Sequence, residues 1–148
     1  MISEYTLIRG FNGPRPPIVT LCGSTRFAEA FRTATFDLTL SGHVVLSIGC
    51  DTKTDNALWS DPATAAAIKA ELDTLHLRKI DLADWVLILD IGGYIGESTR
   101  REIAYAQAIG VPVRHLTDWA RPTAGEAPGQ QVHRALSAAG LVRSGGAA

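Results

Sequence analysis

The fold is decided by the stretch WVLIL at residues 85–89, in which all five side chains are apolar. A strand with one face in water alternates apolar and polar side chains, whereas a strand covered on both faces is apolar along its length. The stretch IVTLC at residues 18–22 has nearly the same character, and it stops at Gly23 and Ser24. Both stretches therefore predict central strands of a parallel sheet that lies between two layers of helices.

Outward from these stretches, strands and helices are predicted to alternate. Further strands are expected at 43–48 and 111–116, and helices at 27–40, 62–84, 98–109 and 130–139. In the second helix the predicted buried face consists of Ile68, Leu72, Leu75 and Leu82. Right-handed crossovers between such units give an α/β fold, a three-layer doubly wound (flavodoxin/Rossmann-like) parallel sheet of four to five strands.

The length of 148 residues fits one domain. We expect a lead-in at residues 1–17, a single domain at 18–140 and a flexible tail at 141–148. Residues 49–61 form a long polar loop, of a length that tends to be functional or mobile. Ligands of doubly wound sheets bind outside the carboxyl ends of the strands, so the loops at 22–26 and 91–98 are the candidate site.

The composition excludes several kinds of partner. A formal net charge of -1 gives no support for a nucleic-acid polymer or an anionic membrane. No apolar run approaches a membrane span, and the N-terminus lacks the apolar core of a signal peptide, so a cytoplasmic location is expected. Cys22 and Cys50 are expected to be free buried thiols. The cysteines and histidines are too widely spaced for a zinc pattern, so neither a metal nor a cofactor is predicted.

The first candidate loop contains Gly23, Ser24, Thr25 and Arg26. A glycine lets the backbone approach a ligand, and free N–H groups at the following helix start attract an anion. Two hydroxyls and a bidentate guanidinium add further donors. The alternative is a plain strand-to-helix turn, with Ser24 as N-cap and Arg26 solvated.

The second candidate loop is GGYIGESTRRE at residues 92–102, and it contains Gly96, Ser98 and Glu102. Glu102 is expected in the first turn of a helix that begins at Ser98 or Thr99. A carboxylate there could attack an anomeric carbon. Alternatively, Thr99 and Glu102 match a capping box, which would turn the carboxylate back onto the helix start.

His76 is the third candidate. It flanks the buried face of the predicted helix at 62–84, where it is either a hydrogen-bonded core residue or a catalytic group. Asp84, just before the central strand, is interpreted as a local cap rather than a catalyst.

Taken together, these segments resemble the nucleoside 2-deoxyribosyltransferase superfamily, including its nucleoside 5′-monophosphate N-glycosidase branch. Residues 22–26 are similar to the branch's Cys-Gly-Ser-x-Arg phosphate loop, and residues 83–88 to its Ala-Asp-hydrophobic strand. Residues 96–113 resemble its glycine/serine loop, glutamate-bearing helix and next strand. The Gly-Gly loop before a Thr-x-x-Glu helix also resembles the cytokinin-riboside-phosphate hydrolases.

The resemblance implies an enzyme that cleaves or transfers the N-glycosidic bond of a nucleotide or nucleoside. Glu102 would be the nucleophile at C1′, and Ser24, Arg26, Gly96 and Ser98 would line the phosphate or sugar end. His76 stands where the superfamily has a catalytic aspartate, and a histidine can protonate a leaving base near neutral pH. A homodimer or higher homo-oligomer is implied by the resemblance alone.

Several alternatives stay open at this point. The sequence does not decide which base is bound, ribose or deoxyribose, a phosphorylated or a free nucleoside, or hydrolysis against transfer. A non-catalytic module of the same fold that binds or senses a nucleotide derivative is the alternative function.

Overall fold

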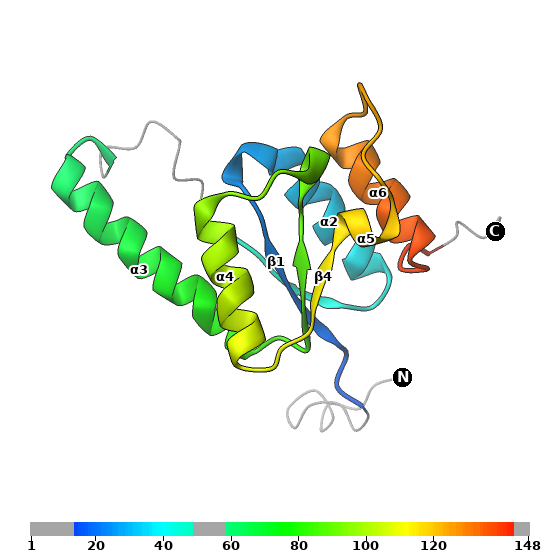
Figure 1. The fold of residues 1–148 in the computed structure, drawn as a ribbon. Coiled ribbons are helices and arrows are strands. Elements are labelled where there is room, and N and C mark those ends of the chain that lie inside the picture. Colours follow the sequence, from blue (N-terminus) through cyan, green and yellow to red (C-terminus); the bar gives the residue numbers. More distant parts are fainter. Residues whose placement is uncertain (1–13, 49–58, 144–148) are drawn as a thin grey trace, which may run out of the picture.

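The computed structural model describes residues 14–48 and 59–143. Their core is a sheet of four parallel strands in the order β2-β1-β3-β4 (Figure 1). The strands are β1 (Ile18–Cys22), β2 (Val44–Leu46), β3 (Trp85–Ile88) and β4 (Val113–His115). The predicted α/β fold with a parallel sheet is confirmed.

Helices cover both faces of the sheet. On one face α2 (Ala28–Leu40) packs against α6 (Pro128–Ala138), and on the other α3 (Pro62–Asp81) packs against α4 (Glu97–Ala108). Three short helical segments complete the described elements: η1 (Thr25–Phe27), η3 (Ile91–Gly93) and α5 (Leu116–Trp119). The sequence did not predict α5, a single turn that packs against α6.

The apolar character of β1 and β3 follows from their place between these layers. Val19 and Leu21 belong to a core cluster on the side of α2 and α6, whereas Cys22 belongs to a second cluster on the side of α3 and α4. In β3, Leu87 joins the first cluster, and Val86 joins the second. Because successive side chains of a strand point to opposite faces, both faces of a central strand have to be apolar here.

The second face of the sheet differs from the prediction in detail. Leu75 and Leu82 were expected to be buried but are 52% and 64% exposed. The buried side chains of α3 are instead those of His76 and Ile80, about one turn apart. The helix ends at Asp81, so Leu82 is already its C-terminal cap and lies off the packed strip.

Helix α4 begins earlier than predicted. Its N-cap is Gly96, and its first residue is Glu97, rather than a start at Ser98 or Thr99. Glu102 is therefore the sixth helical residue, in the second turn and not the first. Thr99 lies inside the helix, so the predicted capping box with Glu102 does not form. Glycine has no side-chain oxygen with which to cap a helix, whereas serine and threonine do. The sequence therefore indicated Ser98 or Thr99 as the helix start, which is too late.

Asp84 was predicted to be a local cap, but the partners of its carboxylate are distant in the sequence. Its carboxylate accepts a hydrogen bond of 2.7 Å from the Ile18 N–H and one of 2.9 Å from Arg15. These contacts tie together the amino ends of β1 and β3, the edge opposite to the candidate loops. Asp84 is thus a structural residue and takes no part in the site described below.

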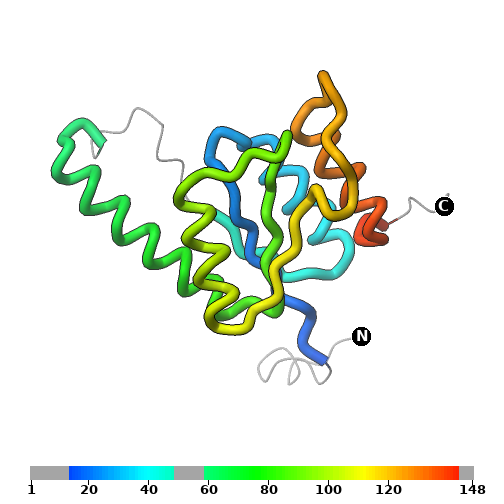
Figure 2. Tube along the Cα trace, viewed as in Figure 1, coloured from blue at the N-terminus to red at the C-terminus, as the bar shows by residue number. Residues whose placement is uncertain are grey.

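The topology creates a switch point between β1 and β3. The chain leaves β1 through α2 toward β2 at one edge, and it leaves β3 through α4 toward β4 at the other. The blue β1 and the green β3 lie side by side in Figure 2 although more than sixty residues separate them. In sheets of this order the crevice at the carboxyl ends of these two strands is the usual ligand site.

Three predictions concern parts at the edge of the described chain. Cys50 and the greater part of the polar loop at 49–61 lie outside the described residues, as do residues 144–148 of the predicted tail. Leu141 and Val142, which fall in that predicted tail, pack against the first core cluster. Within the described ranges, none of the helices combines the length and apolarity that a bilayer span requires.

Candidate functional site

A cavity of about 340 Å³ opens at the carboxyl ends of β1 and β3. Its walls come from the loop after β1, the start of α4 and one side of α3. The volume lies at the lower end of the range of small-molecule pockets, roughly 300–1,000 Å³. The two candidate loops therefore converge on one hollow, at the position that the switch-point rule predicts.

Most of the predicted site residues line this cavity. They come from all three candidate segments, and they are Gly23, Ser24, Thr25, His76, Gly96, Ser98 and Glu102. Arg26 is the exception, because its exposed guanidinium turns to Tyr94. It donates a hydrogen bond of 3.1 Å to the Tyr94 hydroxyl and lies 4.1 Å from the centre of the ring.

The loop after β1 is shaped by close packing. A Cβ at Gly23 would lie 3.1 Å from the Leu89 Cβ and 3.2 Å from the Leu89 carbonyl, so a larger residue meets the next strand. Ser24 is the N-cap of η1, and its hydroxyl accepts a hydrogen bond of 3.3 Å from the Arg26 N–H. The predicted cap is confirmed, and Ser24 still lines the cavity.

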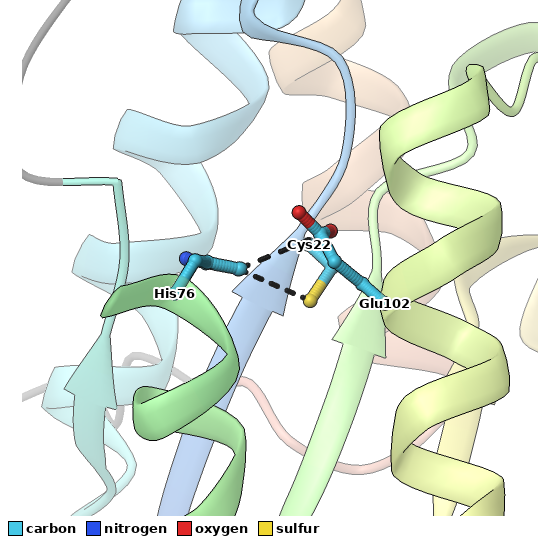
Figure 3. A group of neighbouring side chains, drawn as sticks. All are labelled: Cys22, His76 and Glu102. Atoms are coloured by element: carbon cyan, nitrogen blue, oxygen red, sulfur yellow. Dashed lines mark hydrogen bonds and ion pairs between the residues drawn. The ribbon is translucent and has the colours of Figure 1, made fainter. Parts of the chain in front are cut away.

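Three side chains from three elements meet in the cavity wall. Cys22 ends β1, His76 lies on α3, and Glu102 lies on α4 (Figure 3). The Cys22 Sγ is 3.3 Å from the His76 Nε2, and that nitrogen is 3.9 Å from the Glu102 Oε2. Cys22 is fully buried, and the side chains of His76 and Glu102 are 9% and 15% exposed.

Burial dominates the ionisation of Glu102. It is the largest cause of a pKa raised from 4.5 to about 7, and the charge of Asp73 acts in the same direction. Contact with the Cys22 thiol and the charges of Lys69 and Arg101 act in the opposite direction. Among the described residues, no hydrogen-bond donor reaches the buried Oε2. The carboxyl is therefore close to half-ionised at neutral pH.

The other two groups of the cluster favour their neutral forms. Burial lowers the pKa of His76 from 6.5 to about 4, assisted by Lys79 and opposed by Asp73 and a hydrogen bond to the Leu21 backbone. Burial also raises the pKa of the Cys22 thiol well above its ordinary value. The cluster at pH 7 thus contains a thiol, a neutral imidazole and a carboxyl that is present in both its protonated and its ionised form.

Charged residues of α3 also line the cavity, and the sequence analysis missed them. Lys69 donates a hydrogen bond of 2.7 Å to Asp73, and Lys79 one of 2.6 Å to the Ser47 carbonyl. Together with His76, these residues recur every three or four positions and so share one helix face. That periodicity was the signal that could have identified them.

No family model matches the sequence, and a search of curated proteins finds no match.

Proposed function

We propose that this protein cleaves or transfers the N-glycosidic bond of a nucleoside 5′-monophosphate or a (deoxy)nucleoside, through a covalent glycosyl intermediate on Glu102. The observation that carries this proposal is the position of the Glu102 carboxylate. It lies in the wall of a cavity at the β1/β3 switch point, turned toward Cys22 and His76 rather than onto its own helix start. Its pKa of about 7 leaves a large anionic fraction at neutral pH.

The polar end of the substrate fits the hydroxyl and backbone N–H groups that also line the cavity. Ser24, Thr25 and Ser98 contribute hydroxyls there. The N-cap Gly96 makes no side-chain hydrogen bond, so the first N–H groups of α4 are open to a phosphate or a sugar oxygen. Lys79, on α3, adds a positive charge to the cavity lining.

The proposed reaction has two displacement steps. In the first, a Glu102 carboxylate oxygen attacks C1′, the C1′–N bond breaks, and its electron pair leaves with the base, which takes up a proton. In the second, water attacks C1′, the ester bond to Glu102 breaks, and the water's proton passes to the medium. If a second base attacks C1′ in place of water, the same intermediate gives transfer.

His76 is the candidate proton donor for the leaving base. With a pKa of about 4, roughly one ring in a thousand is an imidazolium at pH 7. His76→Asn therefore separates two cases. Base release slows if the proton comes through this ring, and it stays constant if the base takes its proton from water.

The test is to incubate the protein with a panel of nucleosides and their monophosphates and to follow free base by chromatography. Glu102→Gln is expected to lower base release by at least roughly 10³-fold, because the nucleophile is lost. Glu71→Gln is the matched control, the same exchange at an exposed position of α3 outside the cavity lining. Unchanged base release by a folded Glu102→Gln protein would refute the proposal.

A non-catalytic module that binds or senses a nucleotide derivative is the second candidate. The low pKa of His76 favours it, since this ring replaces the carboxylic acid that the resemblance implies. Calorimetric binding of a nucleotide with no product after prolonged incubation supports this candidate, and rapid base release excludes it.

A further inference from the structure

The Cys22–His76–Glu102 cluster contains three kinds of metal-binding atom in one place. A sulfur, an imidazole nitrogen and a carboxylate oxygen all lie within 4.8 Å of one another. They come from β1, α3 and α4, so the fold brings them together although 54 and 26 residues separate consecutive members. The sequence analysis predicted no metal because these positions form no short spacing pattern.

We propose that this cluster binds one Zn²⁺ ion, with Cys22, His76 and Glu102 as protein ligands and the fourth position open to the cavity. Tetrahedral Zn²⁺ with bonds of ~2.0–2.3 Å requires ligand atoms roughly 3.4–3.6 Å apart. The observed separations are 3.3 Å for Sγ to Nε2 and 3.9 Å for Nε2 to Oε2. The third separation, Sγ to Oε2, is within 4.8 Å, so the carboxylate has to move toward the sulfur to close the site around an ion.

The buried carboxylate oxygen is an independent indication of a missing partner. No hydrogen-bond donor among the described residues reaches the Glu102 Oε2, although this atom is buried. An unpaired buried oxygen is costly, and a cation satisfies it more fully than the nearby imidazole does.

The donor set selects the class of metal. A thiolate with an imidazole suits Zn²⁺ and other borderline-soft ions, whereas Mg²⁺ and Ca²⁺ prefer oxygen ligands. On binding, the Cys22 S–H bond breaks, the Zn–S bond forms, and the proton leaves to solvent. The thiolate and the carboxylate together balance the charge of the ion.

The open position follows from the placement of the ligands. His76 and Glu102 line the cavity, while Cys22 is fully buried behind it. An ion bound by all three thus has its free side toward the cavity, where water or a ligand oxygen can coordinate. Occupation by Zn²⁺ commits the Glu102 oxygen to the metal, so the ion would inhibit the proposed glycosyl transfer to that oxygen.

The experiment uses untagged full-length protein freed of metal by a chelator. Equilibrium dialysis is expected to give one Zn²⁺ per chain, and Co²⁺ as a probe is expected to show a thiolate charge-transfer band and the intense visible bands of four-coordinate cobalt. Cys22→Ser is expected to lose that charge-transfer band and to bind Zn²⁺ at least tenfold more weakly. Cys50→Ser, the same exchange at the other cysteine, is the matched control and is expected to bind normally.

A second variant and a second readout separate metal binding from folding. Glu102→Gln retains the thiol and is expected to keep the charge-transfer band but to bind Zn²⁺ at least tenfold more weakly. Zn²⁺ is expected to raise the thermal midpoint of the wild type by more than that of Cys22→Ser. Absence of stoichiometric binding by the wild type, full binding by folded Cys22→Ser, or equal losses in Cys22→Ser and Cys50→Ser would each overturn the inference. Because no nucleotide is present, a failure of the proposed glycosidase activity leaves these results unaffected.

Discussion

Replacing Glu102 by Gln is expected to stabilise the metal-free protein in alkaline solution. The carboxyl is buried beside Cys22 and His76, where its neutral form is favoured. When the wild type is brought to a pH above the folded pKa, this group has to ionise in a poorly solvated place. Gln has nearly the same shape and cannot ionise, so the variant avoids this cost.

The magnitude follows from the difference between the folded and unfolded pKa values of Glu102. The pKa rises from 4.5 to about 7, a difference of about 2.5, which corresponds to about 3 kcal/mol. The folded pKa is the higher one, so the stabilising contribution of the protonated group is complete below pH 4.5. It is lost as the pH rises through about 7. The advantage of Glu102→Gln therefore grows by about 3 kcal/mol between acid and alkaline solution.

The assay is urea unfolding in the presence of a chelator, with the free energy of unfolding measured at steps from about pH 4 to about pH 9. The wild type, Glu102→Gln and the exposed control Glu71→Gln are compared at each step. The control is expected to follow the wild type at every pH. If Glu102→Gln gains no stability over this range, or if Glu71→Gln gains as much, the carboxyl is not ionising in a buried site and the reasoning is refuted.

Further predictions concern the parts that hold the site. Gly23→Ala is expected to lower the free energy of unfolding by about 1–3 kcal/mol in urea, because the new Cβ meets Leu89 at 3.1 Å; an unchanged value would contradict the close packing. The hydrogen bond from the Ile18 N–H holds the pKa of Asp84 below its ordinary 3.8, so its stabilisation is present above that pH and is lost as the pH falls through the folded pKa. Asp84→Asn is accordingly expected to lower the thermal midpoint at pH 7 and to differ less from the wild type in acid. Leu38→Ala, in the fully buried face of α2, is expected to lower the free energy of unfolding by about 2–5 kcal/mol in the same urea assay. A loss below about 1 kcal/mol would contradict the core position of Leu38.

The sheet was predictable because its signal is local. The apolar stretches at 18–22 and 85–89 define central strands without reference to the rest of the chain, and the structure confirms both. The exposed face of α3 was not predictable in the same way. Leu75 and Leu82 continue an apolar pattern, but only a strip through His76 and Ile80 reaches the sheet. How a helix is rotated against its sheet depends on tertiary packing, which periodicity alone does not specify.

The meeting of the two candidate loops could be predicted from the topology of the sheet, whereas the Cys22–His76–Glu102 cluster between them could not. Loops after adjacent parallel strands meet at one edge, so Ser24 and Ser98 could be assigned to one cavity from topology. The contact of Cys22 with His76 depends on how far α3 extends along the sheet, and no sequence pattern encodes that distance. Arg26 shows the same limit, because its turn toward Tyr94 is decided by an aromatic ring 68 residues away.

The position of His76 along the sheet depends on a hydrogen bond made by β1. The Thr20 hydroxyl donates a hydrogen bond of 2.8 Å to the Lys79 carbonyl, which joins the middle of β1 to α3. His76 lies three residues before Lys79, nearly one helical turn, and Cys22 lies two residues after Thr20 on the same face of the strand. A step of two residues along a strand covers ~6.6 Å and a step of three along a helix ~4.5 Å. Both steps lead away from the hydrogen bond between Thr20 and Lys79 in the same direction along the sheet. At their ends the His76 Nε2 lies 3.3 Å from the Cys22 Sγ. Thr20 thus helps to hold α3, and with it His76, in this position beside β1.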